Sequence, residues 1–290
     1  MRRKAGPKAG PETGPETGHA SRTEAAPVAR TRDRRGRAAA VGLLALASLL
    51  AFAPAQADDA TTPACEMPSD MLPTDNVLAK AAEQVKSSHQ LDITVVGSGS
   101  STLAGPDGVS AAYPARLEYY LRQKLPGVTV HVATDLHMRQ PAEDVAPGLA
   151  KVVKDGKPTL VVWQTGTVDA LRLVDADDFR NAIGDGIVAL KTAGADVVLM
   201  NPQYNPRMET VLSVTAYLDN IRVAAQERDV PLFDRFGIMK QWSDAGDFDF
   251  SITTRSQALA RSVHDCIGRA LAEFVVAAAH LGPEEPKDQK

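Results

Sequence analysis

The stretch Thr159–Met200, TLVVWQTGTVDALRLVDADDFRNAIGDGIVALKTAGADVVLM, decides the fold class of this 290-residue chain. Thr159–Trp163 and Asp196–Met200 are short apolar runs without polar alternation, which is the pattern of strands covered on both faces. Between them, Asp178–Ala193 is a predicted helix, and Gly194 follows as a helix-ending residue. A strand, a helix and a second buried strand indicate two parallel neighbours in one sheet.

The same alternation continues on both sides of this stretch. Further strands are predicted at Leu91–Val96, Val128–Val132 and Pro231–Phe233. Further helices are predicted at Val77–Ser88, Tyr113–Lys124, Val145–Lys154, Thr210–Arg228, Phe236–Trp242 and Ser256–His280. The alternation predicts a three-layer, doubly wound α/β fold with a parallel sheet. Ligands of such sheets bind beyond the carboxyl ends of the strands. The positions of interest therefore begin at Gly97, His131, Gln164, Asn201 and Asp234.

The N-terminal region has the organisation of an export signal. Residues 1–37 end in a basic cluster, Ala38–Ala53 is an uncharged apolar run, and Ala55-Gln56-Ala57 is a small-x-small site. This order predicts a secretory signal in residues 1–57, cleaved after Ala57, and a periplasmic or secreted product. The apolar run is shorter than the ~20 residues of a membrane span, so no stable membrane insertion is expected after cleavage. An uncleaved N-terminal anchor is the alternative.

The predicted mature part divides into three segments. Residues 58–76 read as an extended lead-in, residues 77–281 as the α/β domain, and residues 282–290 as a polar, disordered tail. Residues 58–290 hold 22 Lys and Arg against 32 Asp and Glu. Because the net charge of residues 58–290 is negative, nucleic acid is not expected as a partner.

Cys65 and Cys266 are the two cysteines of the chain. In an oxidising compartment an isolated pair predicts a disulfide, which would tie the lead-in to the last helix. Two unpaired buried thiols are the alternative. Two cysteines without clustered histidines do not make a zinc site, so no metal is expected.

A turn of small residues, Gly97–Gly105 (GSGSSTLAG), follows the Leu91–Val96 strand. One reading is a phosphate cradle, but a dinucleotide fingerprint needs glycine where Thr102 stands, and no Gly-Lys-Ser/Thr follows. The other reading is a nucleophilic serine, which requires a nearby histidine to take its proton. His264, at the predicted last helix, is the candidate base.

Three blocks of the chain resemble the SGNH (GDSL-like) hydrolases. The blocks are Gly99–Gly105 with Tyr113–Leu117, then Val161–Asp169, then His264–Ala272, and they occur in the family's order. The resemblance implies a five-stranded parallel sheet, a serine nucleophile and a histidine base. It also implies an oxyanion hole formed by the serine amide, a glycine and an asparagine, and ester hydrolysis without a metal or organic cofactor.

The chain departs from this pattern at the reacting positions. Ser100 is the favoured nucleophile, with Ser101 second and Ser98 third, and one alignment places Gly99 at the nucleophile position. Val168 occupies the family's asparagine position and cannot donate a hydrogen bond. Arg261 occupies the position of the family's acid, three residues before the histidine; Asp265, Asp247 or a backbone carbonyl are the possible substitutes.

A further set of residues is expected around the oxyanion hole and pocket. Gln164 and Thr167 lie beside Val168 and are candidate replacement donors, and Gly166 is the block's glycine. Asp169 is expected to order the loop, and Asn201 either lines the pocket or satisfies backbone groups of its loop.

The prediction is an exported serine esterase of SGNH type with an altered oxyanion hole. Its substrate would be a small-molecule ester or an ester of an envelope polysaccharide or lipid. The alternative is an inactive relative that binds a cell-envelope glycan or acyl group.

Overall fold

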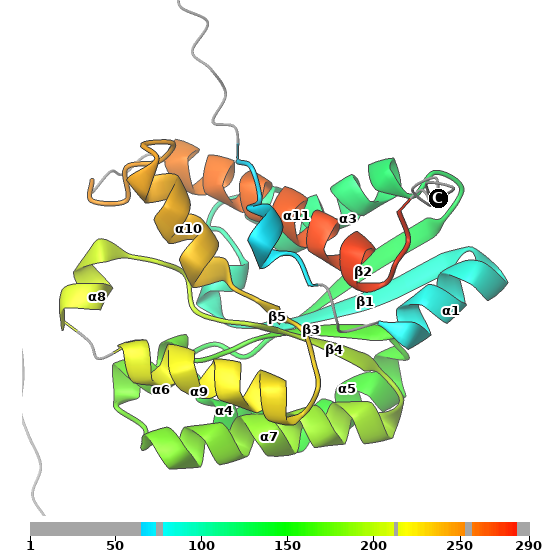
Figure 1. The fold of residues 1–290 in the computed structure, drawn as a ribbon, viewed down its shortest axis with the longest axis horizontal. Coiled ribbons are helices and arrows are strands. Elements are labelled where there is room, and N and C mark those ends of the chain that lie inside the picture. The colour runs from blue at the N-terminus through cyan, green and yellow to red at the C-terminus, as the bar shows by residue number, and fades with distance from the viewer. Residues whose placement is uncertain (1–64, 74–77, 212–213, 253–256, 283–290) are drawn as a thin grey trace, which may run out of the picture. The chain divides into compact units, whose positions relative to one another are not determined.

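Five parallel strands form one sheet in the order β2-β1-β3-β4-β5 (Figure 1). The strands are β1 (Gln90–Gly97), β2 (Thr129–Leu136), β3 (Leu160–Gln164), β4 (Asp196–Met200) and β5 (Leu232–Phe233). The computed structural model describes residues 65–73, 78–211, 214–252 and 257–282. The predicted α/β fold with a five-stranded parallel sheet is confirmed. Strand β2 extends to Leu136, beyond the predicted end at Val132, because it pairs with β1 along its whole length.

Helices cover both faces of the sheet, as Figure 1 shows. One face carries α1 (Ala79–Ser88), α3 (Tyr113–Lys124), α10 (Arg235–Asp244) and α11 (Ala258–Ala278). The other carries α4 (Ala142–Val145), α5 (Leu149–Gly156), α6 (Thr167–Arg172), α7 (Ala176–Ala193) and α9 (Val214–Glu227). The short helices α2 (Gly108–Ala111) and α8 (Pro206–Val211) lie in connections.

Strand β3 is covered on both faces, which explains its apolar run Leu160–Trp163. Leu160 and Val162 pack into the core on one face of the sheet, while Val161 and Trp163 pack into the core on the other. Side chains alternate between the faces of a strand, so a strand covered on both sides needs apolar residues at consecutive positions.

Some predicted helix boundaries are wrong. The helix predicted at Val145–Lys154 is interrupted by the 3-10 turn Ala146–Gly148, because Pro147 cannot continue a helix from α4. The helix predicted at Thr210–Arg228 is divided between α8 and α9. Helices α2 and α6 were not predicted.

Several predictions concern residues outside the described ranges. The leader and its cleavage after Ala57 lie in residues 1–64, residues 58–64 and 74–76 of the lead-in are also outside the described ranges, and the polar tail lies largely in residues 283–290. Within the described ranges, every helix is too short or too polar to cross a membrane.

The predicted disulfide is present. Cys65 and Cys266 are bonded, with their Cα atoms 5.4 Å apart, so the residues before α1 are joined to α11. Helix α11 also packs closely on α3. A Cβ placed on Gly268 would lie 2.4 Å from Cβ of Arg116, so glycine is required for this approach. Together these contacts fix α11, and the histidine it carries, against the start of α3.

Candidate functional site

Three serine hydroxyls converge on one amide at the carboxyl ends of β1 and β3. The Oγ atoms of Ser98, Ser100 and Ser101 lie 3.0, 3.2 and 3.1 Å from Oε1 of Gln164. Gln164 therefore accepts hydrogen bonds from the serine turn. Its Nε2 donor is buried and has no partner among the described residues. A donor role for Gln164 toward an oxyanion stays a prediction.

The three serines differ in exposure. Ser98 and Ser101 are buried, whereas Ser100 is partly exposed. Ser101 Oγ also lies 2.9 Å from the hydroxyl of Tyr113, whose pKa is raised by burial. A Cβ on Gly97 would lie 2.2 Å from Ser101 Oγ, so Gly97 makes room for the turn. Gly99 is exposed and begins the 3-10 turn Gly99–Ser101.

His264 caps a helix. Its Nδ1 accepts the backbone N–H of Tyr113 at 3.0 Å, and Tyr113 is the first residue of α3. The first N–H groups of a helix lack partners within it, and the ring supplies one. Because Nδ1 accepts, a neutral ring carries its proton on Nε2. Burial, with a smaller contribution from the charge of Arg235, lowers the pKa of His264 to about 3.

Asp265 does not orient the His264 ring. Its two carboxylate oxygens accept hydrogen bonds from the side chains of Arg116 and Tyr120. The predicted substitution by Asp265 for the family's acid is therefore wrong. His264 receives a backbone donor at the nitrogen where a catalytic histidine would present an N–H to an acid.

Asp169 ties the segment after β3 to the start of α4. Asp169 Oδ1 accepts the backbone N–H of Ala142 at 2.7 Å, and burial raises the pKa of Asp169. These contacts agree with a loop-ordering role. Gly166 has φ 94°, and the Oγ1 of Thr167 is buried without a partner among the described residues. A donor role for Thr167 stays a prediction.

Asn201 ties the end of β4 to the start of α10. Its Nδ2 donates to Oδ1 of Asp234 at 2.6 Å, and its Oδ1 accepts the N–H of Phe236 at 2.9 Å. Asn201 thus satisfies its loop and helix, the second of the two roles considered for it. Gln203 and Tyr204, just beyond it, line a cavity.

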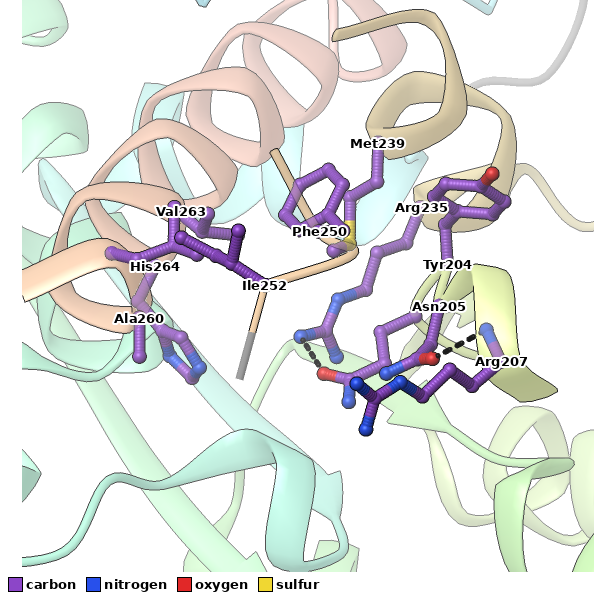
Figure 2. Close-up of a pocket in the computed structure, with 12 residues that line it drawn as sticks. Tyr204, Asn205, Arg207, Arg235, Met239, Phe250, Ile252, Ala260, Val263 and His264 are labelled. Carbon is purple, nitrogen blue, oxygen red and sulfur yellow. Dashed lines mark hydrogen bonds between the residues drawn. The ribbon is translucent and has the colours of Figure 1, made fainter. Parts of the chain in front are cut away.

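This cavity has a volume of about 330 Å³ and lies between α10, α11 and the loop after β4 (Figure 2). Its apolar lining consists of Met239, Phe250, Ile252, Leu259, Ala260 and Val263. Its polar lining consists of Gln203, Tyr204, Asn205, Arg207, Arg235 and His264. In Figure 2, Arg235 from α10 and His264 from α11 approach the cavity from opposite sides. None of these lining residues is a serine of the turn.

Arg235 lines the cavity and contacts both the serine turn and Gln203, and it is not among the residues predicted from the sequence. Its side chain is fully buried. Nη1 lies 3.4 Å from both the backbone oxygen and Oγ of Ser100, and Nη2 lies 3.1 Å from Oε1 of Gln203. Its Nε has no partner among the described residues. The available signal was its position, directly after the last strand at Asp234.

A histidine–carboxylate pair at the end of β2 was also missed. His137 Nε2 lies 3.0 Å from Oδ2 of Asp135, and His137 Nδ1 lies 3.2 Å from Oε1 of Gln140. His137 and Ser98 line one small cavity of about 10 Å³. This volume is about that of one water and does not admit an acyl group. Within the described ranges, no cluster of three or more His, Cys, Asp or Glu residues is arranged for a metal ion.

Comparison with known proteins places these observations in a family. A model of the non-GDSL lipase-like family matches residues 64–281. No curated protein matches the sequence.

Solved structures share the fold. TesA matches with a TM-score of 0.51 and 20% identity, over 63% of this chain and 98% of that one. A catalytic mutant of Axe2, an acetylxylan esterase from Geobacillus stearothermophilus, matches with a TM-score of 0.52 and 15% identity, over 65% and 94%. At these identities the likeness shows the fold alone, and it confirms the SGNH-type architecture. The family match supports a lipase- and esterase-like hydrolase.

Proposed function

The chain belongs to the non-GDSL lipase-like family, and from that premise we propose an exported SGNH-type protein that binds an acyl group. In this proposal the site binds its ligand without the serine–histidine proton transfer of an esterase. The observation that carries it is the hydrogen bond from the N–H of Tyr113 to Nδ1 of His264.

The hydrogen bond matters because serine is a weak nucleophile without a base. A base would have to accept the serine proton on a free nitrogen of its ring. His264 has Nδ1 engaged with the Tyr113 N–H, and in the neutral ring Nε2 carries the proton. Moving that proton to Nδ1 would set two N–H groups against each other. The lowered pKa adds to the difficulty, since each pKa unit disfavours the imidazolium by about 1.4 kcal/mol.

The lining of the 330 Å³ cavity supports an acyl ligand. The lining combines six apolar side chains with polar ones, among them Arg235 and His264. Pockets that pair apolar surface with placed polar groups are typical small-molecule sites. A cell-envelope glycan is the less favoured ligand, because the six apolar side chains offer it few hydrogen bonds.

Export is proposed from two features. Residues 1–57 have the order of a secretory signal, with a basic cluster, an apolar run and Ala55-Gln56-Ala57. The Cys65–Cys266 disulfide is a bond expected in an oxidising compartment such as the periplasm or the extracellular space.

Ester hydrolysis is the second candidate function, and two observations favour it. Ser100 is the partly exposed serine of the turn, and its Oγ faces the guanidinium of Arg235. Ser98 lines a cavity with His137, which is paired with Asp135. A serine near a histidine–carboxylate pair is the constellation of a hydrolytic triad. The substrate would be a small-molecule ester or an ester of an envelope polysaccharide or lipid.

Hydrolysis of p-nitrophenyl acyl esters and labelling by a fluorophosphonate probe separate the two functions. The purified wild-type chain is compared with Ser98→Ala, Ser100→Ala and Ser101→Ala. Ser110→Ala serves as the control, because Ser110 is exposed and its hydroxyl donates to the backbone oxygen of Asp107 in its own turn. The proposal expects no labelling and equal background hydrolysis in all five proteins. Labelling that is lost only in Ser100→Ala, or only in Ser98→Ala, would reject it and identify the nucleophile.

A further inference from the structure

Arg235 is a buried cation without a described counter-ion. It is fully buried, and its hydrogen-bond partners among the described residues, Ser100 and Gln203, are neutral. Its charge also lies 5.3 Å from the ring centre of Tyr113. Burying an unpaired charge is costly, and buried charges are normally paired. The burial lowers the pKa of Arg235 to about 10, so the guanidinium still carries its charge at neutral pH.

The cavity beside Arg235 lacks negative charge in its described lining. That lining includes two arginines, Arg207 and Arg235, and neither Asp nor Glu. The Nε of Arg235 is buried and has no partner in the described ranges. A buried N–H without a partner indicates a position where a hydrogen-bond acceptor could bind.

We infer that Arg235 and His264, which reach into the cavity from α10 and α11, form a carboxylate subsite, and that its ligand is a free acyl carboxylate. This inference rests on the proposed binding function and names its ligand class. A guanidinium presents parallel N–H donors that match the two oxygens of a carboxylate. The Nε2–H of His264 supplies a further donor from α11, so the histidine contributes to binding in the tautomer that excludes it as a base.

The apolar part of the lining determines what the carboxylate is attached to. Met239, Phe250, Ile252, Leu259 and Val263 line the same cavity and favour an alkyl chain. Burying each methylene of such a chain raises the affinity about fourfold. A neutral ester of the same chain would fill the apolar side but leave Arg235 without an opposite charge. The subsite therefore discriminates the acid from its ester.

Isothermal titration calorimetry on the purified wild-type chain at pH 7 tests the subsite. The probes are octanoate, 1-octanol, methyl octanoate and glucuronate. Octanoate is expected to bind at least tenfold more tightly than the alcohol and the ester. Equal affinities for octanoate and methyl octanoate would overturn the inference. Glucuronate binding as tightly as octanoate would overturn the acyl part, because it places the carboxylate on a sugar.

Single-residue variants test whether Arg235 causes the preference for octanoate over octanol. Arg235→Gln is expected to reduce the preference for octanoate over octanol to less than threefold, and Arg235→Lys to retain most of it. Arg222→Gln removes one positive charge from the surface of α9, outside the cavity lining, and is the matched control, expected to keep the preference within threefold. An unchanged preference in Arg235→Gln would contradict the inference. If Arg235→Gln does not fold, the wild-type comparison of acid and ester still decides.

Different measurements would reject the proposed function and the carboxylate subsite. Consumption of methyl octanoate during the titration, measured by chromatography, would reject binding without turnover. The affinity of octanoate relative to octanol would still test the carboxylate subsite in that case.

Discussion

The backbone N–H of Tyr113 donates a 3.0 Å hydrogen bond to Nδ1 of His264, which lies 151 residues further along the chain. This bond joins the first residue of α3 to α11 and makes the ring an acceptor at Nδ1. A histidine in this position stabilises the fold as a helix cap and presents its remaining nitrogen as a donor. The predicted role of His264 as a base has to be weighed against this geometry.

Acid should destabilise the protein through His264. The pKa of His264 is lowered to about 3 in the fold, against about 6.5 in an unfolded chain. The unfolded chain binds a proton as the pH falls below 6.5, while the folded chain does not until near 3. The contribution is therefore fully present above pH 6.5 and is lost between 6.5 and 3. Between pH 7 and pH 5, urea unfolding should show a loss of about 2 kcal/mol in the wild type that His264→Gln lacks. An identical pH dependence in both proteins would contradict this assignment.

Gly268→Ala should destabilise the packing of α11 on α3. The added methyl would lie 2.4 Å from Cβ of Arg116 and 2.9 Å from the backbone nitrogen of Leu117. Overpacking of this kind costs about 1–3 kcal/mol. Gly148→Ala is the control, since nothing lies within 4 Å of its Cβ position. Urea unfolding should show the loss in Gly268→Ala alone; equal stabilities of the two variants would be inconsistent with the close approach.

Reduction of the Cys65–Cys266 disulfide should lower the free energy of unfolding. The bond closes a loop between residues 201 positions apart, so its loss increases the conformational entropy of the unfolded chain. The expected loss is about 2–5 kcal/mol. The measurement is urea unfolding with and without dithiothreitol, and the Cys65→Ser, Cys266→Ser double variant should be insensitive to the reductant. A wild type whose unfolding ignores dithiothreitol would contradict the prediction.

Val168→Asn should not create an esterase. The substitution places an amide donor where the SGNH pattern has asparagine, and one such donor typically changes a hydrolytic rate by about 10²–10³-fold. Because His264 does not offer a free nitrogen to the serine, p-nitrophenyl ester hydrolysis should stay within threefold of the wild type. Val168→Leu controls for the altered loop. A rise of two orders of magnitude in Val168→Asn alone would show that a competent base is present.

The fold was largely predictable because burial leaves a local mark on the sequence. Strand β3 must be apolar on both faces, so Leu160–Trp163 was recognisable without coordinates. Strand β4 was predicted with its observed bounds. The break at Pro147 was missed because the apolar positions on either side continue a helical pattern through it.

The site was less predictable because it is assembled from residues far apart in sequence. The serine turn could be found, since Gly97 and Ser98 follow a strand. No local pattern indicated that the Tyr113 N–H would face His264, or that Arg235 would be buried without a described carboxylate. Asp135 and His137 were overlooked because β2 was predicted to end at Val132, which left them in a loop rather than at a strand's carboxyl end.

Whether His264 is a donor or a base is decided by ¹⁵N nuclear magnetic resonance of its imidazole nitrogens in the purified chain between pH 5 and pH 8. We expect a proton on Nε2, an unprotonated Nδ1, and no titration across this range. A proton on Nδ1 with a free Nε2, or an imidazolium that forms near pH 6.5, would contradict this expectation and restore His264 as the candidate base of a serine esterase.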